Sequence, residues 1–361
     1  MVTISLCMIV KNEEEVIGRC LESVKDLVDE INIVDTGSTD NTKKIIEPFT
    51  DRIFDFQWID NFAAARNFSF QQATKKYILW LDADDVFSAE EQEKFKALKE
   101  SLTTDIDAVS MNYNLSFDDE GNVSSSLRRY RLVKREKQFQ WIGAVHEYLS
   151  VGGNLLDSDV SVSHLPLSHD HNRNIEIYNQ LVQSGEQLSP RDTFYYANEL
   201  LDHSQYEKAI FFYEQFLMSK LGWVEDNIRA CYRLADCYSH LDDKENYLTS
   251  LFRSFEYDIP RPEACCRLGY HFMEQFKNYE AIHWYEQALL IKQNPHAPFQ
   301  NNTFTTWLPH LQLCVLFDRL QQYEIANAHN ELAGTFIPND KKILYNRDYF
   351  NRVLKKEEGS V

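Results

Sequence analysis

The segment Y-I-L-W-L-D-A-D-D (Tyr77–Asp85) ends an apolar run with three acidic residues within four positions. Its apolar side chains predict a buried strand, and this strand presents Asp82, Asp84 and Asp85 together at its carboxyl end. Carboxylates this close repel one another unless a cation lies among them. Oxygen ligands suit a hard divalent ion, so the pattern predicts a Mg2+ or Mn2+ site that holds a phosphate-bearing ligand. The alternative is a solvated acidic turn that caps the helix after Phe87.

The residues around this segment alternate between strand and helix patterns. This alternation predicts an α/β fold with a mostly parallel, Rossmann-like sheet and right-handed crossovers. Ligands bind outside the carboxyl ends of the strands in such sheets, so Asn12, Asp35 and Asp40 are expected to share one site with the acids after Leu81. We expect strands at Thr3–Val10, Ile31–Val34, Arg52–Gln57, Tyr77–Leu81, Asp107–Tyr113 and Arg128–Val133, a hairpin turn at residues 117–122, a helix whose first turn holds Glu13, Glu14 and Glu15, and a helix at Ala63–Thr74.

Four motifs follow one another in order through this half of the chain. They are M-I-V-K-N-E-E (Met8–Glu14), V-D-T-G-S-T-D-N-T (Val34–Thr42), A-A-R-N (Ala64–Asn67) and L-D-A-D-D (Leu81–Asp85). Together they resemble the nucleotide-sugar domain of family 2 glycosyltransferases. That family has the GT-A fold and is generally inverting. The resemblance therefore implies a GT-A glycosyltransferase domain over residues 1–173 and a UDP-sugar as its donor.

The same resemblance implies roles for individual residues. Asp35 would hydrogen-bond the nucleobase, usually uracil, and Arg66 would face the diphosphate, for which a guanidinium is well suited. Asp84 would contact the metal and Asp82 the ribose or sugar. The alternative for Arg66 is a surface ion pair with Asp60 or Asp85. The remaining nucleotide-sugar contacts that the resemblance implies are Val10, Asn12, Glu14, Ser38, Ala83 and Trp141.

The sequence contains neither a G-x-G-x-x-G string nor a P-loop string. A glycine loop is therefore not expected to hold the phosphates, which leaves a metal and an arginine to neutralise them. This absence disfavours a dinucleotide-dependent oxidoreductase.

The segment F-Q-W-I-G-A-V-H-E-Y-L (Phe139–Leu149) is the expected acceptor side of the site. Its V-H-E-Y-L string resembles the form found in a bacterial branch of the family that acts on cell-surface sugars and on peptides, and it departs from the commoner E-D pair. Glu147 is the expected catalytic base, because a carboxylate that is ionised at pH 7 can accept a proton directly. His146 could serve as the base instead, or bind the metal. The alternative is that the two side chains only orient each other.

Histidines gather in S-V-S-H-L-P-L-S-H-D-H-N-R-N (Ser161–Asn174), at a spacing that is not a standard zinc pattern. The resemblance implies that a histidine after the last strand of the domain contacts the metal or the diphosphate, and His164 fits this position best. His169 and His171 are equally suitable chemically. The alternative for His164 is an ordinary hydrogen-bonded histidine at a domain junction.

The second half of the chain has helical rather than strand-like periodicity. Y-E-K-A-I-F-F-Y-E-Q-F-L (Tyr206–Leu217) reappears in degraded form as Y-E-A-I-H-W-Y-E-Q-A-L (Tyr279–Leu289), with Ala209 and Ala281 72 positions apart. This spacing is close to two helical hairpins, and the pattern resembles the tetratricopeptide consensus, in which small residues let paired helices approach. We expect an all-α repeat domain over residues 174–361 that binds the acceptor or forms homodimers. The alternative is a non-repetitive helical bundle.

Composition limits the remaining classes of function. The chain has 361 residues, enough for two domains, and a net charge of −19, which disfavours nonspecific binding of nucleic acid. Its apolar runs are too short to span a membrane and no signal peptide is recognised. Seven cysteines without a C-x-x-C motif indicate buried thiols in a reducing cytoplasm.

These observations predict a metal-dependent inverting glycosyltransferase with Mg2+ or Mn2+ as its cofactor. The pairing of such a domain with helical repeats resembles bacterial enzymes that glycosylate ribosomally made peptides, including S-glycosylation of cysteine in bacteriocin-like peptides. A thiol, with a pKa of about 8.5, needs less help from a base than a sugar hydroxyl does. One alternative is a transferase that builds cell-surface polysaccharide or lipid-linked glycan. Another is a helical scaffold attached to an inactive transferase.

Overall fold

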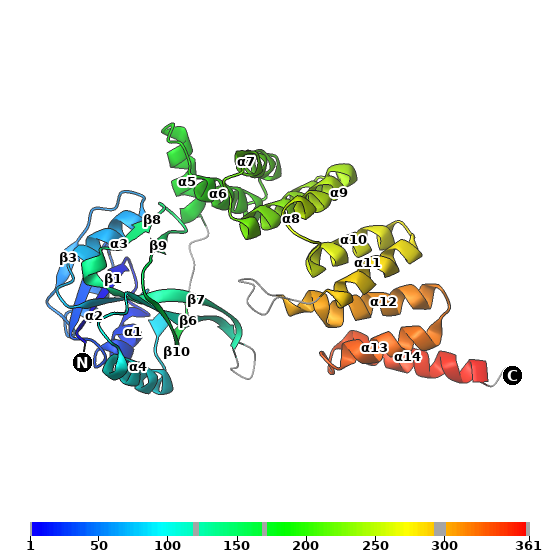
Figure 1. Cartoon of the computed structure of the whole chain (residues 1–361), viewed down its shortest axis with the longest axis horizontal. Helices are drawn as coiled ribbons and strands as arrows, with labels where there is room; N and C mark the ends of the chain where they lie inside the picture. The colour runs from blue at the N-terminus through cyan, green and yellow to red at the C-terminus, as the bar shows by residue number, and fades with distance from the viewer. Residues whose placement is uncertain (1, 118–122, 168–171, 292–300, 359–361) are drawn as a thin grey trace. The chain divides into compact units, whose positions relative to one another are not determined.

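The computed structural model describes residues 2–117, 123–167, 172–291 and 301–358, and the chain divides into two units (Figure 1). The first unit is Met1–Asp192 and the second is Thr193–Val361. The domain boundary expected between residues 173 and 174 lies at the start of a helix inside the first unit and stays a prediction. No helix in the described ranges is long and apolar enough to cross a membrane.

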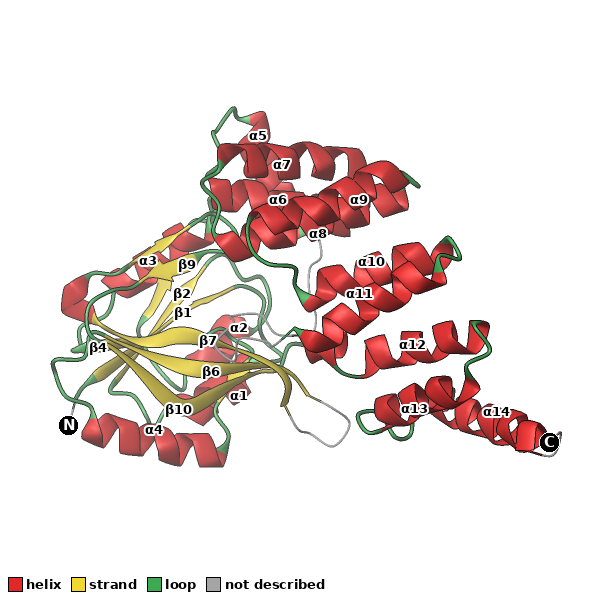
Figure 2. Cartoon of the chain, turned by 45° about the vertical axis from the view of Figure 1, so that its right-hand side comes forward, coloured by secondary structure: helices red, strands yellow, loops and turns green. Residues whose placement is uncertain are grey.

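A twisted sheet forms the centre of the first unit (Figure 2). It has eight strands, in the order β3-β2-β1-β4-β7-β6-β10-β5. Strands β1 to β4 pair in parallel, as do β6 and β10, whereas β7 runs antiparallel to β4 and β6. The expected mostly parallel α/β sheet is confirmed. The strands are β1 Ile4–Val10, β2 Glu30–Asp35, β3 Ile53–Asp55, β4 Tyr77–Trp80, β5 Asp85–Val86, β6 Ala108–Phe117, β7 Val123–Lys134 and β10 Leu155–His164; a separate hairpin pairs β8 Gln140–Ile142 with β9 Tyr148–Ser150.

Helices pack on both faces of this sheet because β1 is apolar on both of its sides. Ile4, Leu6 and Met8 point into one core cluster, which also contains buried residues of α1 and α4. Cys7 points the other way, into a cluster that Phe70 of α3 completes. A strand that is buried on both faces is typical of a parallel sheet. The helices of this unit are α1 Ile17–Val24, α2 Thr42–Ile46, α3 Phe62–Gln71, α4 Ala89–Ser101 and α5 Arg173–Gln183.

The first helix begins later than the sequence pattern indicated. Asn12 adopts a left-handed backbone with φ 56°, and the chain then turns so that the N–H groups of Val16 and Ile17 both donate to the carbonyl of Glu13. The expectation that the three glutamates occupy the first helical turn is therefore wrong, because they lie in the turn before it. Strand β3 and helix α3 are also shorter than expected. The expected hairpin turn at residues 117–122 lies almost wholly outside the described residues.

The second unit consists of helices, and it contains the helical pairs that the sequence pattern predicted. Ala209 and Tyr213 of α7 are fully buried, as are Ala281 and Tyr285 at the same offsets in α11. A Cβ on Gly269 of α10 would lie only 2.8 Å from the Tyr285 ring, so glycine is what lets α10 and α11 approach. The helices are α6 Pro190–Asp202, α7 Tyr206–Ser219, α8 Val224–His240, α9 Lys244–Arg253, α10 Pro262–Glu274, α11 Asn278–Leu290, α12 Trp307–Arg319, α13 Tyr323–Gly334 and α14 Lys341–Glu358.

Candidate active site

Three parallel strands end at the same edge of the sheet, and each is followed by polar residues. In the register of β1 and β2, Val10 lies opposite Asp35, and β4 lies on the other side of β1. The residues after these strands therefore gather at one edge, as expected for ligand binding in an α/β sheet. They include Asn12, the loop that follows Asp35, and the acidic turn at 82–85.

Two of the acids converge with a histidine into a group that can hold a metal ion. Donor atoms of Asp84, Asp85 and His164 all lie within 4.8 Å of one another. The His164 Nδ1 atom is 3.3 Å from Asp84 Oδ1 and 3.7 Å from Asp85 Oδ1. Burial alone would lower the pKa of His164, but the two nearby carboxylates, Asp84 first and then Asp85, raise it to about 10. The negative field that raises this pKa would also attract a cation.

Asp85 has one oxygen with no hydrogen-bond partner among the described residues. This oxygen, Oδ1, is buried, and the whole residue is 0% exposed. A buried, unpartnered carboxylate oxygen is costly, and a metal ligand role accounts for it. The sequence pattern puts Asp85 in the acidic group but gives no sign that it is a ligand. The acids do not cap the following helix, because Ser88 Oγ accepts the N–H of Glu91 at its start.

Arg66 joins the acidic turn to the acceptor-side segment. Its Nη2 atom lies 2.7 Å from Asp82 Oδ1, and its Nε atom lies 2.6 Å from Glu147 Oε1. Burial alone would lower the pKa of Arg66, but the two carboxylates raise it above its usual range. The guanidinium also lies over the rings of Trp80 and Trp141, at 5.0 and 4.8 Å from their centroids. The alternative of an ion pair with Asp60 or Asp85 does not describe this contact.

Asp35 ends β2 almost completely buried, with an exposed fraction of 1%. Its Oδ1 atom accepts the backbone N–H groups of Gly37 and Ser38, each at 2.9 Å. Burial alone would raise the pKa of Asp35, but hydrogen bonds from Ser38 and Gly37 lower it, with a smaller contribution from Lys43. Its Oδ2 atom is buried and has no hydrogen-bond partner in the described part of the chain. The carboxylate is thus ionised with one acceptor oxygen uncommitted.

The first loop of the site is tied to the loop after Asp35. Asn12 Oδ1 accepts the backbone N–H of Thr39, and the N–H of Asn12 donates to Ser38 Oγ. Glu14 Oε2 accepts the N–H of Asn41. These contacts place three of the expected nucleotide-sugar residues together, although their side chains bind protein groups.

Glu13 is a site residue for which sequence reasoning gave no role. Burial first, and then the nearby charge of Asp84, raise the pKa of Glu13 to about 7. The signal was available in the sequence, since Glu13 directly follows Asn12 in the first motif. Arg173 is the first residue of α5, and its guanidinium lies 4.7 Å from the centroid of the Phe62 ring. Its positive charge lowers the pKa of Glu13.

The loop that carries Glu147 has an unusual backbone. Gly143 has φ 104° and His146 has φ 50°, so a left-handed residue immediately precedes the expected base. The carbonyl of His146 accepts hydrogen bonds from Arg191 Nε and Nη2, and the Tyr178 hydroxyl donates to the carbonyl of Val145. The ring of His146 stacks on Tyr178 and is not part of the group formed by Asp84, Asp85 and His164.

The other expected site residues lie in the core around this edge. Val10 and Ala83 are buried in the main core cluster. Trp141 is buried against Trp80, with ring centroids 4.7 Å apart, and its indole N–H has no partner in the described ranges. His169 and His171 lie outside the described residues.

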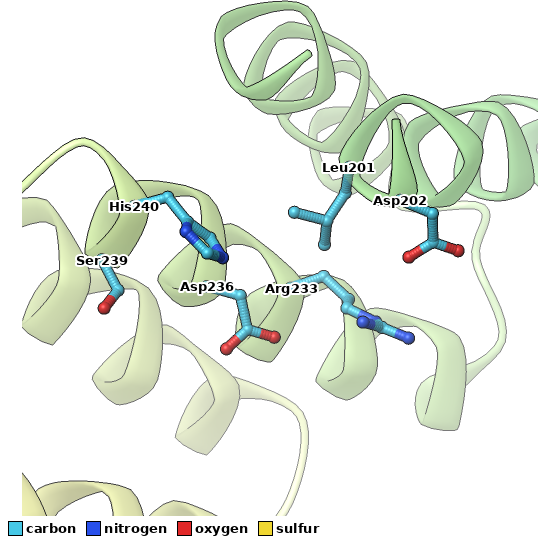
Figure 3. Close-up of a pocket in the computed structure, with 6 residues that line it drawn as sticks. All are labelled: Leu201, Asp202, Arg233, Asp236, Ser239 and His240. Carbon is cyan, nitrogen blue, oxygen red and sulfur yellow. The ribbon is translucent and has the colours of Figure 1, made fainter. Parts of the chain in front are cut away.

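The helical unit has a pocket of its own, with a volume of about 240 Å³. It is lined by residues of α6 and α8, and Figure 3 shows Leu201 and Asp202 on one side and Arg233 and Asp236 on the other. Asp236 is paired with Arg267, at 2.5 Å. In the described part of the chain, Arg233 has no hydrogen bond or ion pair. The lining is completed by Ser239 and His240.

Comparison with protein families gives one match in each unit of the chain. Residues 5–154 match the family model described as "Glycosyl transferase family 2", and residues 262–295 match a tetratricopeptide repeat. The N-terminal unit thus contains a region that is similar to family 2 glycosyltransferases. The expected combination of this domain with tetratricopeptide repeats is therefore confirmed.

Individual relatives match shorter parts of the chain. The SPbeta prophage-derived glycosyltransferase SunS of Bacillus subtilis is 35% identical over 148 residues, which is 40% of this chain and 34% of SunS. A TPR repeat-containing protein of Synechococcus elongatus is 48% identical over 85 residues, 24% of this chain and 21% of that protein. The chain thus spans about a third or less of these relatives. The crystal structure of S. aureus TarS 1-349 is 13% identical, with a TM-score of 0.37, and the match covers 71% of this chain and 91% of that one.

The Arg66 bridge is expected to be an important contact for the stability of the transferase domain. Arg66→Met should lower the free energy of unfolding by about 2–4 kcal/mol, because it leaves two largely buried carboxylates unpaired. This is less than for a fully dry pair, since Asp82 is 31% exposed. Urea denaturation of the full chain, followed by circular dichroism, measures the change.

The control is the triple variant Arg66→Met, Asp82→Asn, Glu147→Gln, which removes the bridge without leaving charges behind. It should recover most of the stability that the single change loses. A single variant that is as stable as the parent, or a triple variant that is no more stable than the single one, would contradict this account of Arg66.

Proposed function

We propose that this protein transfers a sugar from a UDP-sugar to a peptide acceptor, with inversion and with the help of a divalent cation. One observation carries the proposal: Arg66 joins Asp82 of the cation motif to Glu147 of the acceptor-side segment. One guanidinium therefore contacts both a residue of the proposed donor side and a residue of the proposed acceptor side. The family 2 match over residues 5–154 supports the reaction class.

The proposed cation site consists of Asp84, Asp85 and His164. Its unpartnered Asp85 oxygen and its converging donor atoms support a bound ion. Both Mg2+ and Mn2+ accept carboxylate oxygen, but Mg2+ strongly prefers oxygen ligands, so an imidazole in the set favours Mn2+. When bound, such an ion would neutralise the negative charge of the diphosphate leaving group.

Asp35 is the proposed reader of the nucleobase. Its ionised carboxylate has one buried oxygen without a partner, and the imide N–H of uracil is a donor that would satisfy it. The other oxygen is held by the backbone of Gly37 and Ser38, so the carboxylate is oriented before any ligand arrives. The further nucleotide-sugar contacts are proposed for Val10, Asn12, Glu14, Ser38, Ala83 and Trp141.

Glu147 is the proposed base. Arg66 holds Oε1, whereas Oε2 has no hydrogen bond in the described ranges, so Oε2 can accept the proton of the acceptor. The acceptor sulfur or oxygen forms a bond to the anomeric carbon as the bond from that carbon to the diphosphate oxygen breaks. The electron pair of the broken bond leaves with UDP, and the proton resides on Glu147. His146, stacked on Tyr178, is the alternative base.

A peptide is the proposed acceptor, and a cysteine thiol is its proposed reactive group. The 35% identity to SunS over 148 residues, the tetratricopeptide match and the polar pocket around Arg233 support this part of the proposal. The repeats could also serve homodimer formation. All seven cysteines are free and buried, which supports a reducing, cytoplasmic location.

The nucleotide should be recognised as a uridine diphosphate. In the presence of Mn2+, UDP should raise the thermal stability of the full chain more than ADP or GDP does. At a hundredfold excess over its Kd, UDP should stabilise the folded chain by about 2.7 kcal/mol. Asp35→Asn should weaken UDP binding by about tenfold to a hundredfold, because it removes a hydrogen bond to a charged acceptor. Differential scanning fluorimetry and calorimetry measure both effects.

Asp55→Asn is the matched control, because Asp55 shares Lys43 with Asp35 but is 80% exposed. Its UDP affinity should stay within about twofold of the parent. Equal shifts for the three nucleotides, or loss of UDP affinity in the control alone, would count against the assignment of Asp35.

Transfer itself is tested with the full chain, Mn2+, a panel of UDP-hexoses and three peptides that differ only in carrying Cys, Ser or Ala at one position. Mass spectrometry should show a hexose on the Cys peptide, a slower reaction on the Ser peptide and none on the Ala peptide. Glu147→Gln should lower kcat/KM by about 10²–10⁴ because it removes the base, while UDP affinity is retained.

Two results would reject parts of this proposal. Modification of an oligosaccharide but of no peptide would replace the peptide acceptor by a glycan. Full activity of Glu147→Gln would show that another group is the base. The variant to measure would then be His146→Gln.

A further inference from the structure

Arg131 is the largest side chain in the described structure that is fully buried, and it lies directly behind the cation motif. Its Nη1 atom is 2.8 Å from Asp85 Oδ2, and both side chains are 0% exposed. Its guanidinium is sandwiched between the rings of Trp80 and Tyr113, at 3.9 and 4.2 Å from their centroids. A charge is rarely buried this deeply unless it is paired, and here the partner is a proposed cation ligand.

Arg131 lies at a β-bulge in β7. Strand β7 pairs Leu132 with Val109 and Tyr130 with Ser110, so Arg131 is the extra residue between two consecutive pairs. Bulges re-aim a side chain that regular alternation would direct elsewhere, and they are frequent beside active sites. The bulge in β7 thus directs the side chain toward β4 and the acidic turn.

The two oxygens of Asp85 have separate partners. Oδ2 is committed to the protein, because it pairs with Arg131 and also accepts the backbone N–H of Asp82 at 2.9 Å. Oδ1 has no hydrogen-bond partner in the described part of the chain and lies 3.7 Å from His164 Nδ1. Fixing Oδ2 therefore fixes the direction in which Oδ1 points, which is toward Asp84 and His164. The hydrogen bond from the Asp82 N–H to Oδ2 also fixes the backbone where the acidic turn begins.

We propose that Arg131 is a positioning residue for the cation site, acting through Asp85. It holds the carboxylate in the orientation that offers Oδ1 to the ion, and its charge offsets part of the repulsion among Asp82, Asp84 and Asp85. It does not contact substrate. This inference rests on the proposed function, because it needs a cation at Asp84, Asp85 and His164.

The test measures Mn2+ binding to the full chain by electron paramagnetic resonance, without turnover. Arg131→Met fills the space without the charge. It should weaken Mn2+ binding by about tenfold or more, which corresponds to about 1.4 kcal/mol or more, because Asp85 is no longer held in place. Arg131→Lys keeps the charge but cannot provide a planar fork between two rings. The Mn2+ affinity of this variant should lie between those of the parent and Arg131→Met, about threefold to tenfold below the parent. UDP affinity in the absence of Mn2+ should be unchanged in both, which shows that the Asp35 end of the site is folded.

Arg128→Met is the matched control, because Arg128 lies on the same strand but is 41% exposed and bonds to Ser110 and Asn112. It should bind Mn2+ like the parent. A folded Arg131→Met variant with parental Mn2+ affinity would overturn the inference and leave the cation site standing. If that variant does not fold, Arg131→Lys decides alone, and parental affinity in it overturns the inference. A parent chain that binds no Mn2+ would reject the cation site and this inference with it.

Discussion

Carboxylates crowded at one edge of a sheet repel one another, and two inward-facing arginines counter this repulsion here. Arg131 pairs with Asp85 in a fully buried contact, and Arg66 bridges Asp82 and Glu147. Each guanidinium is also covered by aromatic rings, and both lie over Trp80. A single tryptophan on β4 therefore supports the two cations that allow an acidic motif to follow the strand.

This arrangement offsets part of the repulsion within the acidic turn. Burial alone would raise the pKa of Asp82, but Arg66 and Arg131 lower it, so the carboxylate stays ionised. His164 adds a further positive charge, since Asp84 and Asp85 raise its pKa to about 10. Asp84, Asp85 and His164 are the residues that would hold a divalent cation, and the ion would supply positive charge where the His164 proton now does. Pre-orientation of this kind lets binding energy be used for the ligand instead of for ordering the site.

Much of this architecture could be read from the sequence because it depends on local patterns. The apolar run that ends in Asp82, and the motifs around Asp35 and Arg66, predicted the parallel strands and the edge of the sheet where a ligand would bind. The repeats around Ala209 and Ala281 likewise depend on helical spacing and on buried small residues. Such signals arise within a few neighbouring residues, so a single sequence displays them.

Other features depend on contacts between distant segments and were not foreseen. Arg131 reads as an ordinary strand residue, and its contact with Asp85 depends on how β7 pairs with β6 and on where the turn after β4 lies. The pairing of Arg66 with Glu147 joins positions 81 residues apart. The late start of α1 depends on the left-handed backbone of Asn12, which a polar motif does not reveal.

The most direct test of the central claim is the crystal structure of the full chain grown with Mn2+ and UDP, with the ion located by its anomalous scattering. The account predicts one manganese peak in the coordination sphere of Asp84, Asp85 and His164, with Arg131 still on Asp85 and the uracil imide on Asp35. A manganese ion bound away from these three side chains, with the nucleotide remote from Asp35, would contradict it.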